Sequence, residues 1–100
     1  MRFKDGVDLS GVRPELVLAM SVADGVYNAF GEMLVITSVM DGEHMPASLH
    51  YVGAAFDCRY PVHSDAVVRS VVSQLRRALG PQYDVVEEET HLHIEFQPKE

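Results

Sequence analysis

A segment near the C-terminus alternates strictly between polar and apolar residues over positions 91–96, which read His-Leu-His-Ile-Glu-Phe. Strict alternation predicts a β-strand, because successive side chains of a strand point to opposite faces of the sheet. The apolar residues would face a core, and His91, His93 and Glu95 would lie together on the other face. The two imidazoles would then be about 7 Å apart, by the usual strand rise. This face is either a solvated polar surface or part of a site.

The rest of the chain predicts helices and further strands around this segment. Two stretches have apolar residues at helical spacing. The first begins at Pro14 and ends before Gly31, and the second follows Ser64 as N-cap and stops at Gly80-Pro81. Short apolar runs predict strands over residues 33–37, 54–59, 83–88 and 92–96, with an irregular lead-in over 1–12 and a loop over 39–49.

The order helix, strand, strand, helix, strand, strand predicts an α+β fold. We expect one domain over residues 1–100, with two helices packed on a mainly antiparallel sheet of about four strands. With 47% hydrophobic and 23% charged residues, a packed core is expected rather than disorder. A chain of 100 residues is small, so a bound metal would add stability as well as chemistry.

Composition narrows the function classes. The formal net charge of −7 argues against a general affinity for nucleic acid or anionic membranes. Cys58 is alone, so no intrachain disulfide can form, and we interpret it as a small buried residue. No apolar run is long enough to cross a bilayer, and residues 1–6 lack the apolar core of a signal peptide. We therefore expect synthesis in the cytoplasm.

A second segment, Ser48-x-His50-x-x-Gly53-x-Ala55-x-Asp57, carries an imidazole and a carboxylate seven positions apart. A loop leading into a strand can bring two such groups to one ion, and both are ordinary zinc ligands. A third ligand from a distant strand would leave the fourth position open for water, which distinguishes a catalytic zinc site from a structural one.

Together with the downstream His91-x-His93, this pattern resembles the D-Ala-D-Ala carboxypeptidase-like zinc peptidases, which share the hedgehog/DD-peptidase fold. The resemblance covers roughly residues 34–98, and the chain is similar to short phage and prophage versions. It implies zinc on His50, Asp57 and His93. It also implies hydrolysis of amide bonds in peptidoglycan stem peptides.

The resemblance leaves the general base open between two residues. Many members place a glutamate three positions before the last zinc histidine, where this chain has Thr90. His91 is therefore the preferred base, as in relatives that use H-x-H, and Glu88 is the second choice. Glu95 is either a partner of a zinc histidine or a solvent-facing carboxylate.

Substrate anchoring departs from the family pattern. Larger members carry an arginine shortly after the Thr-Ser pair, and this chain has residues 39–41, Val-Met-Asp, in that place. The candidate substrate-binding residues are then Ser48, Arg59 and His44, the last two as replacements for the arginine.

The expected partner is the peptide part of peptidoglycan, without nucleic acid and without membrane insertion. The expected place of action is the cell wall, reached by phage-mediated release or as a virion component. Two alternatives stay open: a zinc-binding module without catalysis, and a phage structural protein with the same fold. The sequence does not predict the oligomeric state or the bond that is cleaved.

Overall fold

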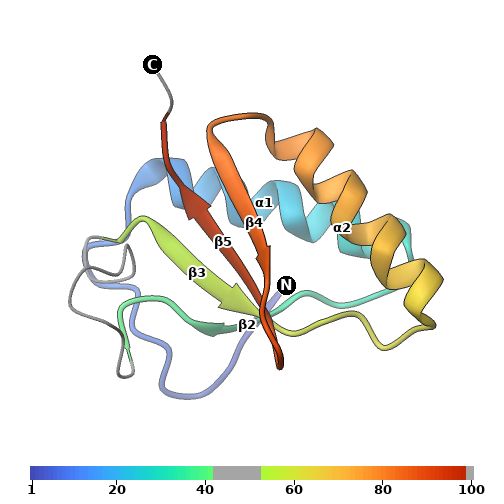
Figure 1. The fold of residues 1–100 in the computed structure, drawn as a ribbon. Coiled ribbons are helices and arrows are strands. Elements are labelled where there is room, and N and C mark those ends of the chain that lie inside the picture. Colours follow the sequence, from blue (N-terminus) through green and yellow to red (C-terminus); the bar gives the residue numbers. More distant parts are fainter. Residues whose placement is uncertain (42–52, 99–100) are drawn as a thin grey trace.

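A five-stranded sheet with the spatial order β1-β2-β3-β5-β4 carries the fold, in a computed structural model that describes residues 1–41 and 53–98 (Figure 1). β1 runs parallel to β2, and the other neighbouring strands are antiparallel. The strands are β1 (Arg2–Phe3), β2 (Val35–Ser38), β3 (Ala55–Cys58), β4 (Tyr83–Glu87) and β5 (Leu92–Phe96).

The two helices, α1 (Pro14–Ala29) and α2 (Asp65–Leu79), lie on the same side of the sheet (Figure 1). α1 begins with Pro14, whose missing N–H is not needed in the first turn. α2 begins after Ser64, whose side chain accepts a hydrogen bond from the Val67 N–H at 3.4 Å. It ends at Leu79 and is followed by the C-cap Gly80, which has a φ of +86°. Both helices were predicted, as were the cap and the stop of α2.

The core lies between these helices and the inner face of the sheet. Alternation along β3 and β5 directs Phe56, Cys58, Leu92 and Ile94 inward, and all four are fully buried. From α1, the core receives Leu16, Ala19, Met20, Ala23, Val26 and Tyr27, and from α2 it receives Val71, Val72 and Leu75. The side of β5 that carries apolar residues is therefore the core side, as the sequence predicts.

The α+β class with two helices is confirmed, but the sheet has one strand more than expected. Residues 1–12 were predicted to be irregular, whereas Arg2–Phe3 forms β1 beside β2. The Arg2 N–H donates to the Leu34 carbonyl and the Lys4 N–H to the Ile36 carbonyl, each at 2.8 Å. Two exposed residues are too few to show the alternation that predicts a strand. The formation of β1 depends instead on the backbone groups at the free edge of β2, with which it pairs.

None of the described helices is long and apolar enough to span a membrane.

Candidate functional site

The polar face of β5 lies beside a buried aspartate of β3. In the antiparallel pair of β3 and β5, Asp57 is directly opposite His93. Side chains of opposed residues share one face and approach closely. Alternation places Phe56 and Cys58 in the core, so Asp57 points to the other side of the sheet, where the helices do not lie.

Four side chains meet on this face, and we call Asp57, His91, His93 and Glu95 the Asp57 cluster. The Nδ1 atom of His93 is 3.0 Å from Oδ1 of Asp57, and its Nε2 atom is 2.9 Å from Oε1 of Glu95. The Nε2 atom of His91 is 3.6 Å from Oδ2 of Asp57. The Asp57 carboxylate therefore has an imidazole near each of its oxygens.

Asp57 is only 8% exposed, and it is the one buried charged residue within residues 1–41 and 53–98. Burial of an ionised carboxylate is unfavourable unless cations or hydrogen-bond donors compensate for the lost water. His93 compensates directly when it is protonated. The Asp57 hydrogen bond is the main cause that raises the pKa of His93 above its ordinary value of 6.5, while burial acts in the opposite direction.

His91 is more accessible than His93, with side-chain exposures of 35% and 17%. Its Nδ1 atom is 3.0 Å from the Thr90 hydroxyl oxygen. An Nδ1–H donated to Thr90 leaves Nε2 free to accept a proton beside Asp57. This arrangement suits a proton acceptor at the edge of a metal site, which is the role predicted for His91. The contact with Thr90 was not predicted, because both residues lie in the bend just before β5 rather than in the strand that the alternation predicted for His91.

Glu88 is an exposed residue in the connection between β4 and β5. Its N–H donates to the His91 carbonyl at 3.0 Å, and its carbonyl accepts from the Tyr60 hydroxyl at 2.6 Å. Within the described part of the chain, no hydrogen bond or ion pair joins the Glu88 carboxylate to the Asp57 cluster. Of the two residues predicted as general base, His91 therefore belongs to the Asp57 cluster, and the Glu88 carboxylate makes no described contact with it.

The predicted substrate-binding residues are placed less fully. Arg59 is exposed just after β3, where its N–H donates to the Val35 carbonyl and its carbonyl accepts from the Tyr27 hydroxyl. Its guanidinium forms no hydrogen bond or ion pair with the Asp57 cluster among the residues described. Ser48 and His44 lie outside the described residues, as does the predicted zinc ligand His50.

Gly53 fixes where the chain enters β3 and so positions Asp57. Its φ is +72°, and a Cβ atom at this position would lie 2.2 Å from the Gly11 carbonyl oxygen. The Gly53 carbonyl accepts a hydrogen bond from the Arg13 N–H at 3.0 Å. The glycine in the S-x-H-x-x-G-x-A-x-D pattern therefore has a physical reason, since only glycine permits this approach.

The donor atoms of the Asp57 cluster are compatible with zinc. Asp57 and His93 supply a carboxylate oxygen and an imidazole nitrogen that already lie side by side, which are two of the three predicted ligands. Among the residues described, no group of three or more histidine, cysteine, aspartate or glutamate side chains has the geometry of a metal site. The third predicted ligand, His50, is outside that part of the chain.

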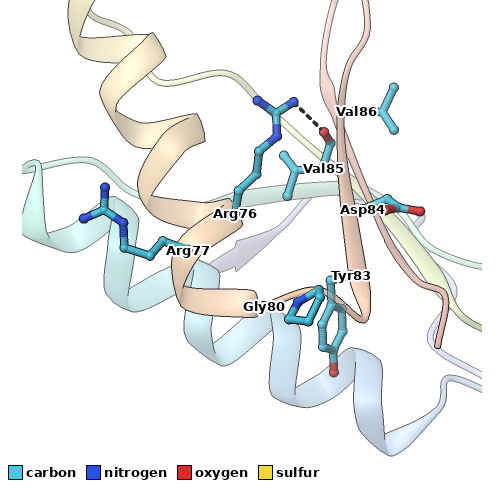
Figure 2. Close-up of a pocket in the computed structure, with 8 residues that line it drawn as sticks. Arg76, Arg77, Gly80, Tyr83, Asp84, Val85 and Val86 are labelled. Atoms are coloured by element: carbon cyan, nitrogen blue, oxygen red, sulfur yellow. Dashed lines mark hydrogen bonds between the residues drawn. The ribbon is translucent and has the colours of Figure 1, made fainter. Parts of the chain in front are cut away.

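A groove elsewhere on the surface lies between the C-terminal end of α2 and the edge strand β4 (Figure 2). Arg76 donates from Nη2 to the Val85 carbonyl at 2.8 Å, and Glu87 lies 4.0 Å from its Nη1 atom. Arg76 thus covers a carbonyl that an edge strand would otherwise expose, which protects the edge from pairing with another chain. The groove has a structural explanation and contains no residue of the Asp57 cluster.

Comparison of the chain with protein-family models, with curated proteins and with solved structures found no match.

Proposed function

We propose that this chain is a zinc-dependent peptidase that hydrolyses amide bonds in peptidoglycan stem peptides, with His50, Asp57 and His93 as the metal ligands. The observation that supports the proposal most is the buried Asp57 carboxylate, which has the imidazoles of His93 and His91 at 3.0 and 3.6 Å. A carboxylate and an imidazole with a second, more exposed imidazole beside them match the ligand and base types of a zinc hydrolase.

The residues divide the chemistry among them. Zinc, when bound, would polarise the scissile carbonyl and lower the pKa of a water molecule to about 7. His91 would accept a proton from the attacking water at Nε2 and deliver it to the nitrogen of the leaving amine. Thr90 would hold the other proton of this ring at Nδ1, 3.0 Å from its hydroxyl oxygen. The side-chain exposure of 35% gives His91 access to a substrate.

The substrate class follows from the resemblance and from the net charge of −7, which disfavours polyanions such as nucleic acid. Peptidoglycan stem peptides place the proposed site of action at the cell wall, after phage-mediated release or as part of a virion. Ser48, His44 and Arg59 are the proposed substrate contacts.

A zinc-binding module without catalysis is the second candidate. Two observations favour it: among the residues described, the Glu88 carboxylate has no hydrogen bond or ion pair to the Asp57 cluster, and the family arginine is replaced by residues 39–41, Val-Met-Asp. A phage structural protein with the same fold is the third candidate, and it predicts no metal at all.

The test is hydrolysis of purified peptidoglycan by zinc-loaded protein, measured as newly released amino groups and as mass changes of the fragments. We expect activity in the wild type and a loss of about 100-fold or more in His91→Ala, because general-base catalysis contributes about 10²–10⁴-fold. His63→Ala is the matched control, since His63 pairs with Glu32 outside the cluster. Zinc-loaded wild type without hydrolysis would favour the binding module instead.

A further inference from the structure

Glu95 contacts the ring nitrogen of His93 that does not face Asp57. It follows His93 by two positions on β5, so both side chains lie on the same face of the sheet. Its Oε1 atom is 2.9 Å from Nε2, and the side chains of Glu95 and His93 are 18% and 17% exposed. Such a short contact between two largely covered side chains differs from a solvated surface carboxylate.

An imidazole that binds a metal does so through a nitrogen without a proton, while the other nitrogen keeps its N–H. In this chain the two carboxylates contact opposite nitrogens of the same ring: Asp57 lies at Nδ1 and Glu95 at Nε2. A metal ion that takes the place of the Nδ1 proton would still leave an Nε2–H for Glu95 to accept. With a metal ion on Nδ1, the contact with Glu95 would therefore favour the tautomer that carries its proton on Nε2.

We propose that Glu95 is a positioning residue that keeps the proton of His93 on Nε2 and presents Nδ1, beside Asp57, to a divalent metal ion. The inference rests on the proposed zinc site and assigns Glu95 a role that acts through His93. Because a carboxylate on the second nitrogen also increases the basicity of the coordinating nitrogen, its removal should weaken metal binding and free the ring to turn.

The experiment measures the zinc affinity of the full chain by competition with a chromophoric chelator. The variants are Glu95→Ala and Glu95→Gln, with Asp84→Asn as matched control. Asp84 lies opposite Glu95 in the β4–β5 register, so the substitution Asp84→Asn removes one negative charge from the same face of the sheet. Thermal melting in excess chelator checks that each variant folds without metal. Nitrogen-15 chemical shifts of the His93 ring in zinc-loaded protein identify the protonated nitrogen.

We expect Glu95→Ala to weaken zinc binding about 10- to 100-fold, the usual effect of losing such a partner. Glu95→Gln should restore most of the affinity, because its amide oxygen can still accept from Nε2–H, and Asp84→Asn should bind like the wild type. The wild-type spectrum should show a protonated Nε2 and a metal-bound Nδ1.

Two results would overturn the inference in different ways. Equal zinc affinity in Glu95→Ala and wild type, or zinc on Nε2, would reject the positioning role while the zinc site itself stands. Absence of zinc binding in the wild type would reject both the role of Glu95 and the proposed function.

Discussion

At the residue scale, either a proton or a metal ion can join Nδ1 of His93 to Oδ1 of Asp57. Without metal, the protonated His93 ring can donate an Nδ1–H to Oδ1 of Asp57, 3.0 Å away. With zinc, the ion would replace that proton, because a ligand imidazole must give up the proton of its coordinating nitrogen. Metal and proton therefore compete for one site in this account.

The competition gives the metal-free protein a stability that depends on pH. The pKa of His93 is raised in the fold above its ordinary 6.5, mainly by the hydrogen bond to Asp57, so the folded state binds this proton more tightly than the unfolded state. The stabilisation is then complete below about pH 6.5 and is lost as the pH rises through the raised pKa. We expect the free energy of unfolding, measured with urea in excess chelator, to fall over that range.

The matched variant for this measurement is His93→Asn, which retains a polar side chain and removes the titrating group. The difference between wild type and variant isolates the contribution of His93. A difference that stays constant with pH would show that the Asp57–His93 pair does not hold the proton more tightly in the fold.

At the element scale, the start of β3 depends on Gly53. Substitution Gly53→Ala would force a non-glycine residue to a φ of +72° and place its Cβ 2.2 Å from the Gly11 oxygen. We expect a loss of roughly 1–3 kcal/mol in the free energy of unfolding, the usual range for a strained backbone position. Denaturant titration measures this loss.

The same glycine-to-alanine substitution at Gly25 should have the opposite effect on stability. It lies within α1, and a Cβ there would have nothing within 4 Å. Gly25→Ala should therefore stabilise the protein by about 0.5–1 kcal/mol through helix propensity. If both substitutions changed stability alike, the backbone account of Gly53 would be wrong.

The elements with a strong period were predictable from the sequence, and the weak ones were not. α2 has apolar residues at helical spacing together with Ser64 and Gly80 at its ends, so its bounds followed directly. β1 has only Arg2–Phe3, and its pairing comes from β2 rather than from its own residues. Local patterns predict an element only when its stability is encoded locally.

The site was predictable to a similar extent. Alternation over residues 91–96 predicted His91, His93 and Glu95 on one face, and the structure brings the three side chains together beside Asp57, with His91 just before the start of β5. The register that sets Asp57 opposite His93 could not be predicted, because strand register depends on how the whole sheet packs on the helices. The contact between Oε1 of Glu95 and Nε2 of His93 could not be predicted either, because it depends on the conformations of the two side chains.

At the scale of the whole molecule, the sheet separates two environments. Both helices lie on its inner face (Figure 1). This face packs on them with apolar residues, while the outer face carries the Asp57 cluster. A metal ion that binds only the folded state would raise the thermal midpoint by mass action. Function and stability would then depend on the same ligands.

The most direct test is the zinc content of the purified chain, measured by elemental analysis after zinc is supplied and excess metal is removed. We expect about one zinc per chain in the wild type and in the control His63→Ala, and loss of the metal in His50→Ala, Asp57→Ala and His93→Ala. A wild-type protein that holds no zinc would contradict the proposed site and, with it, the peptidase.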